Sequence, residues 1–481
     1  MKANIDLKKK MPPDIPGYIV MVFGPGEIDS LGLNEKEASF AKSIIKKDES
    51  GVVSLNRYDQ KIFVHYIKAH HNRDAFLENC RKAGDQVLSY IRDHGLDRIY
   101  LADKPESPDE VLAYCEGMVL GSYTFDKYKT ENKDRKGRLK SLVLVSTQIP
   151  ESRVRRLNNL LDAVLFCRDL VNEPVSHLNA VRMAERMKEK GEAAGMNVEV
   201  FSKKKIESLK MGGILAVNRG STDPPTFTMM EWKPEGPVNE KPVVLVGKGV
   251  VFDTGGMNIK VGSYMEDMKC DMAGAATMVS VACAVARNRL PVHLITLIPA
   301  TDNRLNGNAY VPGDVIKMHN GMTVEIVNTD AEGRMILADA LSYASGYDPG
   351  LVIDAATLTG SASRAIGDVG IVAMHKDAEK EMKQLKMHGE RVYERIAEFP
   401  FWDEYGELIK SDVADIKNIG GKFAGMITAG KFLARFTAYP FIHLDIAGPA
   451  FLDKKDAYRT KGGSGMGVRL LYEYIKGMAG H

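Results

Sequence analysis

The chain has 481 residues, 44% of them hydrophobic, and a formal net charge of +2 at pH 7. This length exceeds what one ordinary domain needs, so two or more domains are expected. A net charge so close to zero argues against electrostatic nucleic-acid binding as the main function.

Three further features of the sequence indicate a cytoplasmic protein with no membrane partner. The five cysteines are dispersed, without a CxxC pattern, which is typical of a reducing compartment. The charged segment Met1–Pro16 lacks the apolar core of a signal peptide. No apolar run approaches the roughly 18 residues of a membrane-spanning helix.

The first 150 residues alternate between strand and helix patterns. Strands are predicted at Gly17–Phe23, Arg98–Leu101 and Leu142–Ser146, and helices at Phe40–Ile45, Ala75–Asp93 and Pro108–Tyr123. The charge-dense stretch Phe125–Lys140 is predicted to be an exposed turn. This alternation predicts a smaller N-terminal α/β domain over residues 1–150.

The stretch Glu151–Val171 has apolar residues at helical spacing and is followed by Pro174, so one long helix is predicted to join the domains. Residues 151–481 are predicted to comprise this linker and a larger mixed-sheet α/β domain. Its predicted helices are Leu178–Gly195, Ala273–Arg289, Arg334–Tyr347 and Ala378–Glu398. Its predicted strands are Val198–Phe201, Val243–Val246, Val292–Ile298, Thr323–Val327, Leu351–Ala355 and Phe441–Ile446.

The acidic residues Asp330 and Glu332 follow the predicted strand Thr323–Val327 and precede a predicted helix. Ligands bind at this end of a strand in open α/β sheets. Carboxylates at positions i and i+2 of an extended segment point the same way, which suits a cation. The alternative is structural, because Asp-Ala-Glu-Gly is also a good helix start in which Asp caps the first turn.

A second stretch with complementary residue types leaves the predicted strand Val243–Val246. It presents Lys248, Asp253 and Lys260, and Asp271 follows just before a helix of small residues. The glycines favour close approach of the backbone. A phosphate-binding loop is disfavoured because no GxxxxGK[ST] spacing is present.

The two stretches together supply four carboxylates, which would repel one another if buried without cations. Two divalent ions about 3.5–4 Å apart would resolve that repulsion. Oxygen ligands alone would suit magnesium or manganese, and a nitrogen ligand would favour zinc.

These motifs resemble the cytosolic leucyl aminopeptidases, a hexameric two-metal family that includes bacterial aminopeptidase A. The resemblance rests on N-T-D-A-E-G-R (Asn328–Arg334), G-K-G-V-V-F-D-T-G-G (Gly247–Gly256), D-M-A-G-A-A (Asp271–Ala276), R-D-L-V-N-E-P (Arg168–Pro174), D-A-A-T-L-T-G (Asp354–Gly360) and H-L-D-I-A-G (His443–Gly448). It covers the catalytic half densely and the N-terminal part thinly. Val261 departs from the family, which usually has proline there.

The resemblance implies a ligand role for five residues. Asp253 and Glu332 would bridge two divalent ions, either Zn²⁺ or Mn²⁺ with Mg²⁺ or Co²⁺ as further options. Asp330 would complete one site, and Lys248 and Asp271 the other. A lysine ligand must be neutral, and two adjacent dications would depress its pKa.

The resemblance also implies the chemistry and the partners. Lys260 would polarise the scissile carbonyl, and Arg334 would hold bicarbonate as the general base toward a water activated by the two metals. Four positions would contact the substrate, namely Met268, Thr357, Leu358 and Gly360. The implied protein is a homohexameric metallo-exopeptidase that removes the N-terminal residue of a peptide, preferably leucine or another apolar residue.

Three alternatives remain open at this point. A two-metal phosphoesterase would use the same cations to stabilise a transferring phosphoryl group. A DNA-binding or architectural role, beside peptidase activity or in place of it, is known among bacterial relatives, although the near-neutral charge disfavours it. A catalytically inactive homologue is disfavoured because the set of charged residues is complete.

Overall fold

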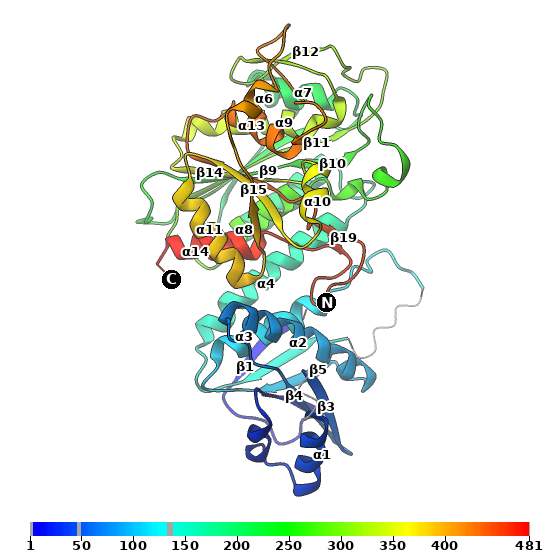
Figure 1. Ribbon diagram of the computed structural model, residues 1–481, viewed down its shortest axis with the longest axis vertical. Coiled ribbons are helices and arrows are strands. Elements are labelled where there is room, and N and C mark those ends of the chain that lie inside the picture. Colours follow the sequence, from blue (N-terminus) through cyan, green and yellow to red (C-terminus); the bar gives the residue numbers. More distant parts are fainter. Residues whose placement is uncertain (1–2, 46–49, 132–137, 481) are drawn as a thin grey trace. The chain divides into compact units, whose positions relative to one another are not determined.

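The structure is a computed structural model, and it describes residues 3–45, 50–131 and 138–480. The chain divides into two compact units (Figure 1). The first comprises Met1–Leu165, Arg391–Tyr393 and Lys454–Lys461, and the second comprises Phe166–Glu390, Glu394–Asp453 and Gly462–His481. Each unit combines helices with a mixed sheet, so the predicted α/β class is confirmed.

The first unit is built on a six-stranded sheet in the order β1-β6-β5-β2-β4-β3. Neighbouring strands are parallel except β3, which pairs antiparallel with β4. Its main elements are β1 (Asn4–Lys8), β2 (Gly17–Val22), α1 (Glu35–Ile45), β3 (Gly51–Arg57), β4 (Gln60–Tyr66), α2 (Arg73–Asp93), β5 (Arg98–Ala102), α3 (Pro108–Gly121) and β6 (Ser141–Val145).

Strands β1, β3 and β4 are absent from the predicted elements. The sequence between β3 and β4 lacks the Asn-Gly signal of a tight hairpin, and Tyr58 takes the positive φ (56°) that glycine or asparagine usually supplies. Of the predicted turn Phe125–Lys140, residues 132–137 lie outside the described residues. Its described residues contain neither helix nor strand.

The predicted long helix is α4 (Glu151–Asn172). The division between the two units falls within it, after Leu165. A domain boundary at residue 150, before this helix, stays a prediction from the sequence.

The second unit is built on a nine-stranded sheet in the order β16-β15-β18-β14-β9-β11-β8-β7, with β10 also paired to β11. Its strands are β7 (Asn197–Phe201), β8 (Thr226–Trp232), β9 (Val243–Gly247), β10 (Gly249–Asp253), β11 (Leu294–Asn303), β14 (Leu351–Ala356), β15 (Ile371–Lys376), β16 (Ile396–Glu398) and β18 (Phe441–Asp445). Its main helices are α5 (Ala180–Ala193), α7 (Gly212–Asn218), α8 (Ala273–Arg287), α9 (Glu332–Ala344), α10 (Gly360–Ile366), α11 (Glu379–Val392), α13 (Gly425–Ala434) and α14 (Val468–Met478).

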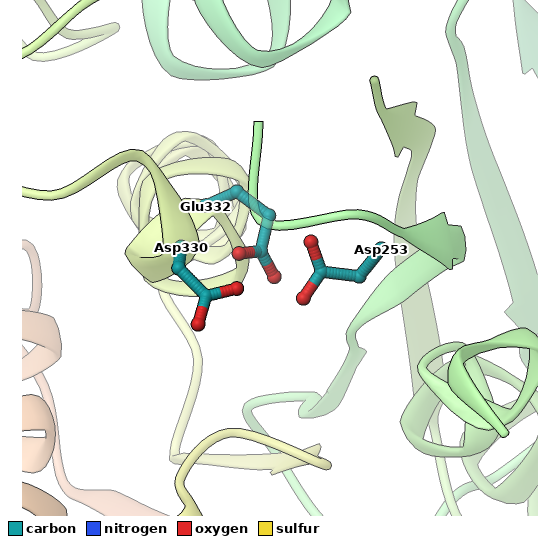
Figure 2. A group of neighbouring side chains, drawn as sticks. All are labelled: Asp253, Asp330 and Glu332. Atoms are coloured by element: carbon teal, nitrogen blue, oxygen red, sulfur yellow. The ribbon is translucent and has the colours of Figure 1, made fainter. Parts of the chain in front are cut away.

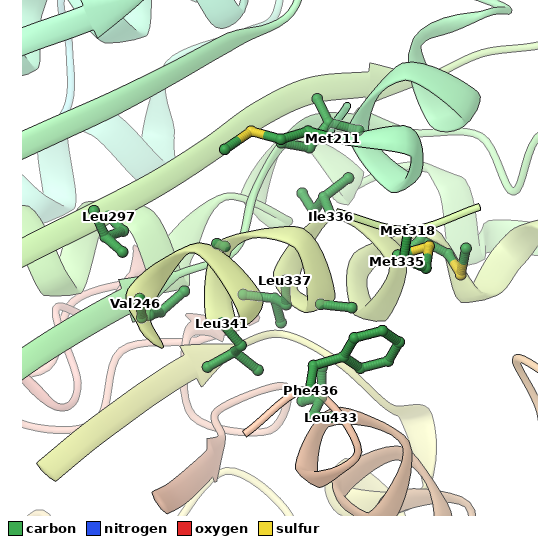
Figure 3. Close-up of a cluster of buried hydrophobic side chains, with 14 of the residues drawn as sticks. Met211, Val246, Leu297, Met318, Met335, Ile336, Leu337, Leu341, Leu433 and Phe436 are labelled. Carbon is green, nitrogen blue, oxygen red and sulfur yellow. The ribbon is translucent and has the colours of Figure 1, made fainter. Parts of the chain in front are cut away.

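Strand β9 occupies the middle of this sheet and is buried along its whole length. It pairs in parallel with β14 on one side and β11 on the other, which confirms the predicted buried parallel strand. On one face its side chains join the core around α9, where Val246 and Leu337 belong to one buried cluster (Figure 3). On the other face α8 approaches so closely that a Cβ at Gly247 would lie 2.6 Å from the Cα of Ala275.

Helix α8 belongs to the stretch Met268–Arg287, which has the length and composition of a membrane span. Its most apolar window is 89% buried within the protein. The helix packs against β9 and β14, and its small side chains permit that close contact.

Several elements and one helix boundary differ from the expectation. Strands β8, β10, β15 and β16 and helices α7, α10, α13 and α14 are additional to the predicted set, and the predicted helix Ala378–Glu398 is wrong after Val392. Helix α11 ends at Val392 because Tyr393 adopts a left-handed conformation (φ 57°), and the amide of Glu394 then bonds back to the carbonyl of Gly389 (2.9 Å). The chain continues as β16.

Candidate metal centre

Three carboxylates from two separate loops converge on one point. Asp253 is the last residue of β10, Asp330 lies in a short turn of 3₁₀ helix (Thr329–Ala331), and Glu332 is the first residue of α9. One oxygen from each lies within 4.8 Å of the others, and Figure 2 shows the side chains pointing toward one another. Asp253 and Glu332 are buried, whereas Asp330 is partly open to solvent.

The local geometry around Asp330 and Glu332 differs from the expectation. The strand before them, β13, is shorter than predicted (Thr323–Glu325) and belongs to a separate three-stranded sheet with β12 (Val315–Lys317) and β17 (Ile416–Lys417). The two acids therefore converge from a turn and a helix start, and the expected extended segment is wrong. The capping alternative is also wrong for Asp330, because α9 has Ala331 at its N-cap without a side-chain bond.

Lys248 links this cluster to Asp271. Its Nζ lies 2.7 Å from Asp271 Oδ1 and 2.9 Å from Glu332 Oε1, and it donates to the main-chain oxygen of Thr357 (3.0 Å). All three charged side chains are buried. The hydroxyl of Thr357 donates to Asp271 Oδ1 (2.8 Å), while Asp271 Oδ2 is buried without a partner.

Lys260 contacts the other two carboxylates of the cluster. Its Nζ lies 2.7 Å from Asp253 Oδ2 and 2.6 Å from Asp330 Oδ1. The loop that carries it turns at Gly255 and Gly256, whose φ values are 86° and 63°. A Cβ at Gly255 would lie 2.4 Å from a neighbouring main-chain oxygen, so this turn requires glycine.

Burial and mutual repulsion raise the pKa of three of the four carboxylates, whereas at Glu332 burial is outweighed by Lys248 and Lys260, which lower its pKa. Burial, followed by the charge of Glu332, raises the pKa of Asp253 and of Asp330. Burial likewise raises the pKa of Asp271 despite the neighbouring Lys248. Such a site holds its acids deprotonated only when enough positive charge is close by.

Arg334 lies two residues after Glu332 in α9 and is buried. Its Nη1 donates to the main-chain oxygen of Asn418 (2.7 Å), and its Nε is buried without a partner. Burial lowers its pKa to about 10, so the guanidinium remains charged at neutral pH. Unused donors on a buried cation fit a small planar oxyanion.

The four predicted substrate positions lie in two segments, one just before Asp271 and one just after β14. Met268 begins the 3₁₀ turn Met268–Cys270 that precedes Asp271, and Thr357 contacts Asp271 directly. Leu358 follows in the same loop, and Gly360 is the first residue of α10. Thr357 is thus in contact with the charged cluster, Met268 lies three residues before Asp271, and Leu358 and Gly360 follow Thr357 in the chain.

The residue that holds the Leu358 loop, Asp445, is not among the residues predicted from the sequence. Asp445 at the end of β18 accepts from the amide of Leu358 (3.2 Å) through Oδ1 and from the hydroxyl of Thr359 (2.7 Å) through Oδ2. Asp445 lies within the quoted motif H-L-D-I-A-G, which carried the resemblance without a role for this residue. Asn418, which orients Arg334, lies 84 residues away and gives no local signal.

The residues present fit two divalent cations. Three carboxylates converge, Lys248 links them to a fourth at Asp271, and the described side chains supply two ammonium groups close by. The unpartnered Oδ2 of Asp271 leaves a buried acceptor available to a further cation. Oxygen-rich donor sets of this kind, with one amine nitrogen, suit Zn²⁺, Mn²⁺ or Mg²⁺.

Comparisons with known proteins agree with this chemistry. The model of the cytosol aminopeptidase family, catalytic domain, matches residues 165–472. A "Probable cytosol aminopeptidase" of Chloroherpeton thalassium is 45% identical over 428 residues, which cover 83% of this chain and 84% of that protein. Another, of Geobacter sulfurreducens, is 45% identical over 407 residues, covering 83% of this chain and 82% of that protein.

Solved structures are similar along nearly the whole chain. A tomato leucine aminopeptidase mutant has a TM-score of 0.86 at 26% identity, covering 99% of this chain and 96% of its own. The bottromycin maturation enzyme BotP in complex with Mn has a TM-score of 0.82 at 28% identity, covering 96% of this chain and 99% of its own.

Proposed function

Because the chain belongs to the cytosol aminopeptidase family and is therefore a metal-dependent aminopeptidase, we propose that it removes leucine or another apolar residue from the N-terminus of peptides. The observation that carries this proposal is the convergence of Asp253, Asp330 and Glu332 within 4.8 Å, with two lysines against them.

Five residues would hold two divalent ions. Asp253 and Glu332 would bridge them, Asp330 would complete one site, and Lys248 with Asp271 would complete the other. When bound, the ions supply Lewis acidity toward the scissile carbonyl and lower the pKa of water. Lys248 would give up its proton in that state, because ligands bind metals through a free electron pair.

Lys260 and Arg334 would act on the reacting groups. Lys260 keeps its proton and would donate to the carbonyl oxygen as negative charge develops there. Arg334 would hold bicarbonate, which supplies a proton acceptor when bound. The support for this role is the partly unused guanidinium of Arg334, which Asn418 orients through only one of its nitrogens in the described structure.

Four residues would select the N-terminal residue of the peptide. Met268 would provide an adaptable apolar contact for an aliphatic side chain. Thr357, Leu358 and Gly360 would line the same subsite and contact the substrate backbone. The position of Thr357 supports this role, because its hydroxyl donates a hydrogen bond to the proposed ligand Asp271.

The ions we propose are Zn²⁺ or Mn²⁺, with Mg²⁺ or Co²⁺ able to replace them where available. The bound Mn in the BotP structure supports manganese by analogy. We also propose a cytoplasmic homohexamer. Light scattering should then give six times the 53.0 kDa of one chain, and a mass near that of one chain would contradict the hexamer.

The test of the activity is hydrolysis of leucine-p-nitroanilide by chelator-stripped protein, with each metal added back singly. We expect metal to restore activity and the N-acetylated substrate to be refused, because a free amine is needed at the centre. Folded protein that is inactive with every metal would contradict the proposal. Faster cleavage of p-nitrophenyl phosphate would instead indicate a phosphoesterase.

A further inference from the structure

Asn303 lies behind the metal centre and has no role in the function described so far. It is the last residue of β11 and is fully buried. Its register partner on the neighbouring strand is Asp253, the last residue of β10. Two strand ends therefore place a neutral amide directly beside a proposed bridging carboxylate.

The side-chain amide of Asn303 contacts both loops of the centre. Its Nδ2 donates to Asp253 Oδ1 (2.8 Å) and to the main-chain oxygen of Thr329 (3.0 Å). Glu332 Oε2 lies 3.5 Å from the same nitrogen. An amide nitrogen carries two hydrogens, so the two shorter contacts use both of them.

The main chain of Asn303 adds a third attachment. Its carbonyl oxygen accepts from both the amide (3.0 Å) and the hydroxyl (2.9 Å) of Thr254, the residue after Asp253. Asn303 thus forms hydrogen bonds with the loop after β10 through its main chain and with the turn before α9 through its side chain.

These bonds determine which oxygen of Asp253 faces the centre. Oδ1 accepts from Asn303 and from the amide of Gly255 (2.9 Å), whereas Oδ2 lies 2.7 Å from the ammonium of Lys260. Oδ1 is therefore occupied by two donors. Oδ2 is the oxygen that remains for a cation.

The amide orientation of Asn303 is also determined. The reverse orientation would set its carbonyl oxygen against the carboxylate of Asp253 and against the carbonyl of Thr329. In the observed orientation Oδ1 is buried without a partner. A buried acceptor left unpaired is unfavourable. The two hydrogen bonds that Nδ2 donates therefore outweigh the cost of leaving Oδ1 without a donor.

We propose that Asn303 is a positioning residue of the metal centre. Its amide holds Asp253 so that Oδ2 alone faces the ions, and its bond to Thr329 fixes the turn that carries Asp330. This inference rests on the proposed two-ion centre. Groups that orient metal ligands typically contribute about 10- to 100-fold in metal affinity or activity.

The experiment is calorimetric titration of chelator-stripped protein with Mn²⁺, comparing the wild type with Asn303→Leu, which keeps the size and removes the donor. We expect two ions per chain in the wild type and a dissociation constant raised about 10- to 100-fold in the variant. At saturating Mn²⁺, kcat should fall while KM stays within about twofold, because a misplaced carboxylate affects the reaction more than substrate binding.

Asn218→Leu is the matched control. Asn218 is also buried, and its Nδ2 donates twice, to the main-chain oxygen of Asp223 (2.8 Å) and to the hydroxyl of Thr301 (3.1 Å) on the same strand β11. It contacts none of the proposed ligands within the described residues. Its variant should lose thermal stability and keep its affinity for Mn²⁺.

Each outcome decides the question. Wild-type Mn²⁺ affinity in Asn303→Leu, or equal weakening in both variants, would overturn the positioning role while leaving the proposed function intact. A wild type that binds no Mn²⁺ would overturn both. If Asn303→Leu does not fold, Asn303→Ala serves with the same expectation, because it introduces no bulk.

Discussion

Arg334 Nη1 donates a hydrogen bond of 2.7 Å to the main-chain oxygen of Asn418. This bond orients a buried guanidinium whose Nε has no partner in the described structure. A buried cation with free donors is unfavourable in a structural role, because its hydration is lost without full replacement. The arrangement is better explained if the free side of Arg334 binds an anion during the reaction.

The first prediction concerns Arg334. In Arg334→Ala, kcat should fall roughly 100-fold or more, because a general base contributes about that much, while two metal ions per chain are retained. Removing bicarbonate should slow the wild type and leave the variant unchanged. Arg334→Lys keeps the charge without the planar fork and should recover little activity. Loss of metal in Arg334→Ala would show instead that the residue is structural.

The second prediction concerns Glu332. Glu332→Ala should lower kcat by roughly 1,000-fold, because the variant loses a bridging ligand and the charge stabilisation that the ligand maintains. Circular dichroism should show a folded protein, and metal analysis fewer than two ions per chain. Glu325→Gln is the control, since that carboxylate lies in β13 and contacts Ser411 rather than the centre. Near-normal kcat in Glu332→Ala would refute the ligand assignment.

The third prediction concerns Asp445, which holds the loop of Leu358 and Thr359. In Asp445→Ala the loop loses its acceptor, and KM for leucine-p-nitroanilide should rise roughly tenfold, equivalent to about 1.4 kcal/mol of binding. Metal content should not change, since Asp445 is not a ligand. Asp445→Asn keeps Oδ1 for the Leu358 amide and should show a smaller rise. Equal effects of both variants would contradict the hydrogen-bond explanation.

The charged residues of the centre could be predicted from the sequence because they lie in compact motifs. Lys248 and Asp253 also follow a clearly apolar, buried strand. Val243–Val246 is apolar and β-branched and is bounded by Pro242 and Gly247, so β9 and the residues after it could be located. The acids Asp330 and Glu332 were noticed because two carboxylates and an arginine within five residues are unusual. Their local conformation was not predictable, because it depends on β13 pairing with β12 and β17, and β17 is distant in sequence.

The neutral residues around the centre gave no signal. Asn303 and Asn418 act only through contacts with residues that are 26 or more positions away in the chain. A single asparagine at a strand end is equally typical of a turn. Such supporting residues can be recognised only when it is known that β10 pairs with β11 and that the start of α9 lies beside these strands.

The final prediction concerns the first unit and its response to pH. His65 in β4 is fully buried, and its Nδ1 lies 2.8 Å from the hydroxyl of Tyr114. Burial lowers its pKa from 6.5 to about 4. The unfolded chain therefore takes up a proton below pH 6.5 that the folded protein refuses until about pH 4, so acid favours unfolding across this window.

The decrease in the free energy of unfolding at pH 4 should reach about 3 kcal/mol, because each unit of pKa shift corresponds to about 1.4 kcal/mol. Urea unfolding of the wild type and of His65→Phe should be compared from pH 8 to pH 4. The wild type should lose stability relative to the variant as the pH falls, because phenylalanine cannot take up a proton in the unfolded state. His71→Phe, at an exposed position, is the control and should follow the wild type. Parallel pH profiles for the wild type and His65→Phe would show that His65 is not the group responsible.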